Sequence, residues 1–184
     1  MKLVNLSDYG IQSMNYYWER MDNFNISKDE LINIGITGDC AQVDVRLVPR
    51  LKQANKILKK HGYEIIVKDG YRSKELYDLV RRKRYENDGK EVTDNTLSTG
   101  ANPHSTGLAI DVNLVRLDDG VEVEIRDKDD WPNSIFKDYY RNKADPKSIE
   151  YQRLQDLLAD TMTSVGFLMG KRNEFHHFEL DTRK

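Results

Sequence analysis

The stretch from residue 102 to residue 114 constrains the fold of this chain more than any other. From Gly107 onward, the pattern repeats every two residues, which predicts a half-buried β-strand. One face carries Leu108, Ile110, Val112 and Leu114, and the other carries Gly107, Ala109, Asp111 and Asn113. Small side chains therefore surround a single carboxylate on the second face, which leaves room for a ligand beside Asp111.

A histidine stands just before this predicted strand. His104 precedes Asp111 by seven residues, so a loop can fold its imidazole back toward the same face. An imidazole and a carboxylate that converge on a hollow suit zinc, which takes nitrogen and oxygen ligands at about 2.0–2.2 Å. Two ligands do not make a site, so a third must come from elsewhere in the chain.

The chain has four histidines, which leaves three candidates for the third ligand. His61 ends a helical pattern, where a cation near the helix C-terminus explains its presence. His176 and His177 lie in a predicted final strand, residues 174–180. Regular alternation puts Glu174 and His176 on one face, whereas a bulge or a late strand start would bring Glu174 and His177 together. Periodicity alone slightly favours His176 and leaves both histidines open.

Two further side chains suit hydrolysis at such a site. Glu174 can take the proton of a water molecule whose pKa a zinc ion lowers to about 7. Arg72 follows Asp69 and Gly70 at a predicted strand-to-helix junction, where loops often present functional groups. Its guanidinium can stabilise the oxyanion of a tetrahedral intermediate.

The remaining pattern predicts an α+β fold, with a central antiparallel sheet flanked by helices and the zinc site on the sheet. Helices are expected from Leu47 to about Gly62, after a Ser73 cap, and from Asp145-Pro146 to Gly166; strands are expected over 63–67, 107–114, 121–125 and 174–180, and a polar loop over 87–103. Residues 1–43 show no sustained period and predict an irregular arm with short helical pieces. We expect residues 1–184 to form one domain, with this arm packed on it.

Composition excludes several functional classes. A net charge of −2 over 184 residues gives no reason to expect nucleic acid or an anionic membrane as partner. The sequence contains no run of about 18 apolar residues, so it predicts no membrane span. The N-terminal residues do not resemble a signal peptide, and we therefore expect a cytoplasmic protein. Cys40 is the only cysteine, which excludes an intrachain disulfide and predicts a small core residue. The sequence predicts no oligomeric state.

Three blocks of the sequence, taken in order, resemble the D-alanyl-D-alanine dipeptidases. They are Asp69-Gly70-Tyr71-Arg72, His104-x-x-Gly107-x-Ala109-x-Asp111 and Glu174-x-x-His177, and the resemblance spans about residues 45–180. That family belongs to a wider group of zinc peptidases that cleave cell-wall peptides, which includes D,D-carboxypeptidases and phage L-alanyl-D-glutamate endopeptidases. The resemblance implies one zinc ion on His104, Asp111 and His177, with Glu174 as general base and Arg72 stabilising the transition state.

The sequence departs from the dipeptidase pattern at three places. Asn102 stands where the family usually has serine, and His176 stands where it usually has tryptophan. The family's downstream Phe-Asp pair, which helps to hold the substrate amino group, is matched only by Phe136-Lys137-Asp138, with the acid displaced by one position. Asn102 can hydrogen-bond a substrate carboxylate or carbonyl, or can serve only as a turn residue. The sequence therefore supports the metal chemistry better than the dipeptide specificity.

Three functions remain open at this stage. The leading hypothesis is zinc-dependent hydrolysis of D-alanyl-D-alanine, or a related short cell-wall peptide, by a metal-activated water. The second is an endopeptidase of the L-Ala-D-Glu type; we expect no wall-binding segment of the kind that phage versions often append, which favours the small-peptide substrate. The third is a zinc-stabilised binding module without activity, which needs neither a base such as Glu174 nor an oxyanion donor such as Arg72.

Overall fold

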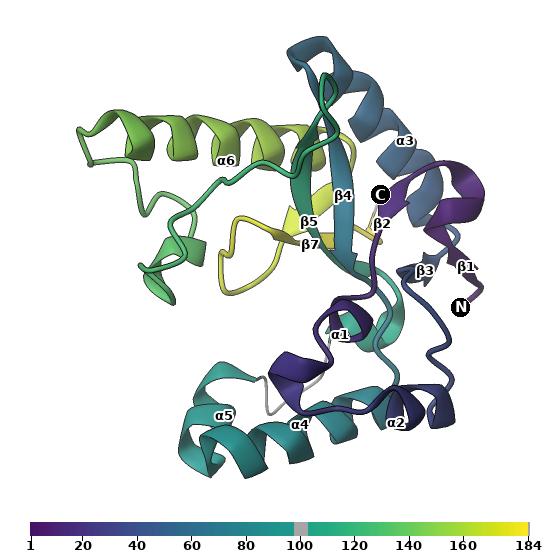
Figure 1. Cartoon of the computed structure of the whole chain (residues 1–184). Helices are drawn as coiled ribbons and strands as arrows, with labels where there is room; N and C mark the ends of the chain where they lie inside the picture. The colour runs from purple at the N-terminus through teal and green to yellow at the C-terminus, as the bar shows by residue number, and fades with distance from the viewer. Residues whose placement is uncertain (98–102, 184) are drawn as a thin grey trace.

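A five-stranded mixed sheet organises the residues that the computed structural model describes, 1–97 and 103–183 (Figure 1). In spatial order its strands are β2 (Gln12–Ser13), β4 (Tyr63–Asp69), β5 (Ala109–Arg116), β7 (His177–Leu180) and β6 (Phe167–Met169). All neighbours are antiparallel except β2 and β4, which are parallel. The predicted α+β class, a single domain with a sheet flanked by helices, is confirmed.

One face of the sheet forms the main hydrophobic core with helices α3 (Leu47–Leu58) and α6 (Pro146–Ser164). Ile110, Val112 and Leu114 of β5 are buried in this core, as the alternation of the sequence predicts. Asp111 and Asn113 lie on the other face and are only partly buried. Burial of one apolar face therefore fixes which face of β5 is left for a binding site.

The ends of the helices follow the predicted signals. The Ser73 hydroxyl accepts a hydrogen bond from the Leu76 amide at 3.2 Å and caps α4 (Lys74–Asp88). Asp145 caps α6 in the same way, with Pro146 in its first turn. After α3 the chain continues through a 3₁₀ turn, η3 (Lys59–His61). This helical segment ends at Gly62, whose φ of 85° lies in the left-handed region.

The N-terminal segment is more ordered than the predicted irregular arm. It contributes β2 to the main sheet, and β1 (Leu3–Asn5) pairs with β3 (Gln42–Asp44) in a separate two-stranded sheet. It also holds η1 (Leu6–Tyr9), α1 (Tyr16–Glu19), η2 (Asp22–Phe24) and α2 (Lys28–Asn33). Strands of two or three residues are too short to show a period, which is why the sequence did not reveal them.

A second apolar cluster joins this segment to α4. Tyr17, Ile26 and Leu31 pack against Leu76, Leu79 and Val80 of that helix. Figure 1 shows α1 and α2 beside α4, below the main sheet. The N-terminal segment thus connects α4 to the body of the domain and reaches the end of β4, where Arg72 lies.

The prediction of a polar loop over residues 87–103 is wrong in part. Helix α5 (Lys90–Thr96) occupies its middle, and α4 extends to Asp88. The sequence shows no apolar period over this helix, and ion pairs help to stabilise it instead: Asp94 pairs with Lys90 one turn earlier and with Arg81 of α4 at 3.0 Å. Asp94 also accepts a hydrogen bond from the Tyr85 hydroxyl at 2.7 Å.

The predicted hairpin after β5 forms, but its second strand is shorter than predicted. The Arg116 amide donates to the Val121 carbonyl at 3.0 Å and the Val123 amide donates to the Leu114 carbonyl at 2.8 Å, on either side of a bridge between Val115 and Glu122. This pairing does not extend into a strand over 121–125. The chain then leaves the sheet edge, and Ile125 enters the core. A further 3₁₀ turn, η5 (Asn133–Ile135), precedes α6. Within residues 1–97 and 103–183, no helix combines the length and apolar character that crossing a membrane requires.

Candidate metal centre

Three side chains from distant parts of the chain meet at one end of the sheet. His104 comes from the 3₁₀ turn η4 (Pro103–Thr106), Asp111 from β5 and His177 from the first position of β7. Asp111 and His177 are direct partners across the two antiparallel strands. One ligand atom from each of the three residues lies within 4.8 Å of the other two.

A backbone carbonyl fixes the imidazole of His104. Its Nδ1 lies 2.8 Å from the Gly70 carbonyl oxygen, so Nδ1 carries the proton and Nε2 is left for a metal. That Nε2 lies 3.7 Å from Oδ2 of Asp111. Gly70 also packs closely against β3, which requires that it has no side chain: a Cβ there would clash with the Gln42 carbonyl oxygen.

The start of β7 determines which of the two adjacent histidines faces Asp111. Phe175 and His176 form a turn in which the His177 amide donates to the Glu174 carbonyl at 3.2 Å, and the strand begins only at His177. The regular strand from Glu174 that favours His176 does not form. Nδ1 of His177 lies 2.8 Å from Oδ1 of Asp111, whereas the His176 carbonyl accepts from the Val112 amide.

The carboxylate of Asp111 and the imidazole of His177 shift each other's pKa. Burial alone would raise the pKa of Asp111, but the imidazoles of His104 and His177 lower it well below its usual range. Burial would lower the pKa of His177, but the hydrogen bond to Asp111 and the nearby Glu179 raise it above the usual value. Burial lowers the pKa of His176, which keeps that imidazole neutral. These directions apply before a cation binds.

The donor set fits zinc. Tetrahedral ligands at about 2.0–2.2 Å from zinc lie roughly 3.3–3.6 Å apart. Nε2 of His104 lies 3.7 Å from Oδ2 of Asp111, and Nδ1 of His177 lies 2.8 Å from Oδ1 of the same carboxylate, so each imidazole is within about 1 Å of that range from one carboxylate oxygen. Two imidazole nitrogens and one carboxylate oxygen leave the fourth position of a tetrahedral ion open, as in hydrolytic zinc sites.

Arg72 lies beside this group in a buried ion pair. Its guanidinium pairs with Asp69, and its side chain is 11% exposed. The guanidinium also lies over the ring of Tyr17, 5.2 Å from the ring centre. Burial alone would lower the pKa of Arg72, but the carboxylates of Asp69 and Asp111 raise it, so the charge is permanent.

Glu174 does not belong to the three-residue group. Its side chain is 15% exposed, and Oε1 lies 3.3 Å from Nε of Arg172. Its backbone bridges to Phe136, which brings the segment around η5 next to the turn before β7. Asp138 of the same segment instead pairs with Arg141, and Asn102 lies outside the described residues.

Sequence analysis did not find the residues that support this site. Asp69 holds Arg72, Tyr17 covers it, and Glu179 lies 3.4 Å from His177. For Glu179 a signal was available, because residues two positions apart in a strand, such as His177 and Glu179, lie on the same face. Tyr17 gave no signal, because only the fold brings residues 17 and 72 together.

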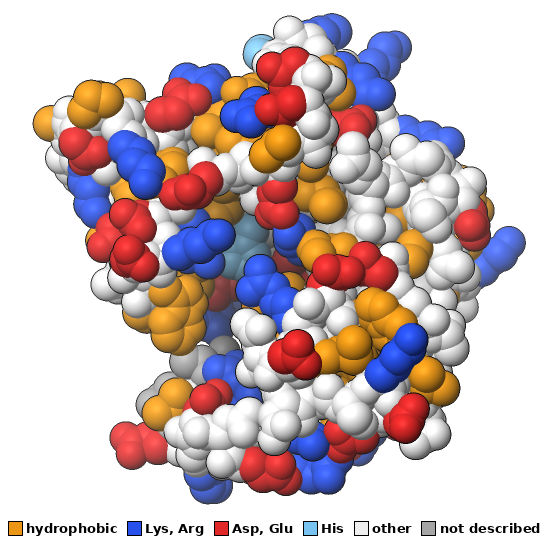
Figure 2. All heavy atoms as spheres, viewed as in Figure 1, with side chains coloured by type: hydrophobic (Ala, Val, Ile, Leu, Met, Phe, Trp, Pro, Cys, Tyr) orange, Lys and Arg blue, Asp and Glu red, His pale blue; other side chains and the backbone are white. Residues whose placement is uncertain are grey.

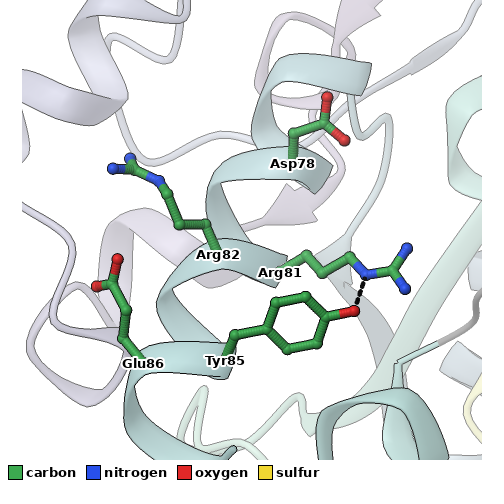
Figure 3. Close-up of a pocket in the computed structure, with 5 residues that line it drawn as sticks. All are labelled: Asp78, Arg81, Arg82, Tyr85 and Glu86. Atoms are coloured by element: carbon green, nitrogen blue, oxygen red, sulfur yellow. Dashed lines mark hydrogen bonds between the residues drawn. The ribbon is translucent and has the colours of Figure 1, made fainter. Parts of the chain in front are cut away.

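The surface over the site is hollowed. Figure 2 shows histidine side chains inside a recess whose rim carries Lys, Arg, Asp and Glu side chains. A separate hollow of about 380 Å³ runs along α4 and is lined by Asp78, Arg81, Arg82, Tyr85 and Glu86 (Figure 3). In it, Nε of Arg81 donates to the Tyr85 hydroxyl at 2.8 Å, and none of the three candidate ligands lines it.

The sequence matches a known peptidase family, and the fold resembles solved peptidase structures. The sequence profile of peptidase family M15, described as D-ala-D-ala dipeptidase, matches residues 38–183. Among solved structures, the fold resembles the LdcB LD-carboxypeptidase (TM-score 0.51, 18% identity, 76% of this chain and 59% of that chain). It also resembles VanYB in complex with D-alanine-D-alanine (TM-score 0.50, 18% identity, 76% of this chain and 72% of that chain). This chain thus covers less than two thirds of the LdcB structure, and no curated protein matches the sequence.

Proposed function

Since this chain belongs to the D-Ala-D-Ala dipeptidase family of peptidases, we propose that it hydrolyses D-alanyl-D-alanine or a related short cell-wall peptide with the help of zinc. The observation that carries the proposal is the convergence of His104, Asp111 and His177. These residues hold the ion, one per chain. When bound, zinc would polarise the peptide carbonyl and lower the pKa of a water molecule to about 7.

We assign Glu174 as the general base. The turn that starts β7 ties its backbone to His177, so the acid and the ligand move as one unit. Nε of Arg172 lies 3.3 Å from Oε1 of Glu174 and helps to hold this side chain in place. In this proposal Glu174 takes a proton from the attacking water and passes it to the leaving amine.

Arg72 supplies a fixed positive charge. Its partners Asp69 and Tyr17 hold the guanidinium in place, so it needs little reorganisation when negative charge develops on the substrate carbonyl oxygen. Asn102 is proposed, from the sequence alone, to hydrogen-bond a substrate carboxylate or carbonyl. The cytoplasmic location expected from the sequence stays a prediction.

The test measures release of free D-alanine from D-alanyl-D-alanine by the purified chain. We expect activity that a chelator abolishes and added zinc restores, and a loss of about 10²–10⁴-fold in Glu174→Gln with zinc still bound. Glu150→Gln is the matched control, because Glu150 is an ion-paired carboxylate on α6 that touches none of these residues.

Two other substrates separate the alternatives. A stem pentapeptide ending in D-alanyl-D-alanine tests carboxypeptidase action, and an L-Ala-D-Glu peptide tests endopeptidase action. Cleavage of the L-Ala-D-Glu bond alone would replace the dipeptide proposal. Tight zinc binding without cleavage of any of the three would instead favour a binding module.

A further inference from the structure

The two ring nitrogens of His177 have different partners. Nδ1 faces Asp111 at 2.8 Å, so this nitrogen points into the ligand group. Nε2 points away, and 3.4 Å from it lies Oε1 of Glu179. In a neutral imidazole one nitrogen carries the proton while the other offers its lone pair. If Nδ1 binds a metal, Nε2 therefore carries the proton, and Glu179 is its acceptor.

The two histidines have outer partners of different kinds. Nδ1 of His104 meets the carbonyl of Gly70, a neutral backbone group that cannot move away. Nε2 of His177 meets a carboxylate whose side chain is 40% exposed. A carboxylate acceptor makes an imidazole a more basic ligand than a neutral acceptor does. The charge at residue 179 is thus suited to strengthen one of the three ligands.

The local backbone directs the ring toward Glu179. Residues 177 and 179 share a face of β7, and the direct partner of Glu179 on β5 is Ala109, whose small side chain leaves space above it. On the other side, Gly170 packs against the ring, where a Cβ would clash with Cδ2 of His177. Gly170 therefore limits the rotation of the imidazole, and Glu179 lies where Nε2 points.

We propose that Glu179 is a positioning residue that holds His177 with Nδ1 toward the metal and strengthens it as a ligand. The inference rests on the zinc site of the proposed function and adds a residue to it. It predicts that residue 179 controls zinc affinity without contacting the metal.

The experiment measures zinc affinity by competition with a chromophoric chelator, which requires no peptide substrate. Glu179→Ala should bind zinc about 10–100-fold more weakly than the wild type. Glu179→Gln keeps an oxygen acceptor but lacks the charge, so its loss should be smaller, at about threefold or more. Glu150→Ala and Glu150→Gln, at a carboxylate that is 50% exposed, should stay within about twofold of the wild type. The absorption spectrum of the cobalt-substituted protein should change in Glu179→Ala and not in Glu150→Ala.

Two results would overturn the inference in distinguishable ways. Wild-type zinc affinity in Glu179→Ala, with an unchanged cobalt spectrum, would remove Glu179 from the site while the proposed function stands. A wild-type chain that binds no zinc would overturn both proposals. If Glu179→Ala does not fold by circular dichroism, Glu179→Gln decides, and wild-type affinity in that variant overturns the inference.

Discussion

Asp111 and His177 face each other across β5 and β7, with Oδ1 and Nδ1 only 2.8 Å apart. The contact joins residues that are 66 positions apart in the chain. Because both side chains stand on a sheet whose other face is the hydrophobic core, their geometry is fixed before any ligand arrives. Such rigidity is what a metal centre with one open position needs, and it leads to the predictions below.

Removal of a ligand should strongly weaken zinc binding. We expect His104→Ala to weaken zinc by more than about 100-fold, because loss of a ligand costs more than the 10–100-fold typical of an outer partner. His61→Ala is the matched control, since His61 is exposed at the end of η3 and should leave zinc content unchanged. Metal analysis after dialysis measures both. Equal zinc content in the two variants would contradict the assignment.

Arg72 should matter for the reaction and not for the metal. We expect Arg72→Lys to lower kcat by about 10²–10³-fold, the loss seen when one oxyanion donor is removed, because lysine lacks the planar guanidinium, which can pair with Asp69 through one nitrogen and still offer other donors to the substrate. Zinc content should not change. Arg46→Lys is the control, because Arg46 forms a similar pair with Asp44 away from the site. A change in KM alone would argue against transition-state stabilisation.

Gly70 should be required for stability. A Cβ at this position would clash with the Gln42 carbonyl oxygen, so we expect Gly70→Ala to lower the free energy of unfolding by about 1–3 kcal/mol. The control is Gly38→Ala, since a Cβ at Gly38 would meet open space. Its effect should stay within about 0.5 kcal/mol. Urea denaturation of both variants measures the difference. Equal urea midpoints for the two variants would contradict the close packing of Gly70 against Gln42.

The stability of the zinc-free chain should depend on pH through the Asp111–His177 pair. The contribution of Asp111, whose pKa is lowered, is complete above about pH 4 and is lost as pH falls through the folded value. The contribution of His177, whose pKa is raised, is complete below about pH 6.5 and is lost as pH rises through the folded value. Both contributions are therefore present between about pH 4 and 6.5.

The stabilisation that zinc provides should increase with pH, in contrast to the contribution of His177 in the zinc-free chain. The ion must displace the proton of His177, so its affinity rises as pH rises through the raised pKa of that residue. We expect the increase in Tm caused by zinc to be larger at about pH 8 than at about pH 5.5. His61→Gln should keep this dependence. An equal increase in Tm at both pH values would indicate that zinc does not bind through His177.

Much of the scaffold was readable from local signals. The alternation through β5 identified its buried face, and the caps at Ser73 and Asp145 located the starts of α4 and α6. These signals are readable because each depends on residues within a few positions of one another. The three motif blocks likewise named His104, Asp111 and His177, which the fold brings together.

The amino-acid sequence by itself determined the fold class, the face of β5 that is free, and the residue types available for a metal. Only the tertiary structure decided that β7 begins at His177, that β2 joins the sheet, and that Tyr17 and Glu179 support the site. The choice between His176 and His177 depends on the turn after Glu174, which the bridge to Phe136 and the pairing with β5 hold in place. Those contacts join segments far apart in the chain, so no local period encodes them.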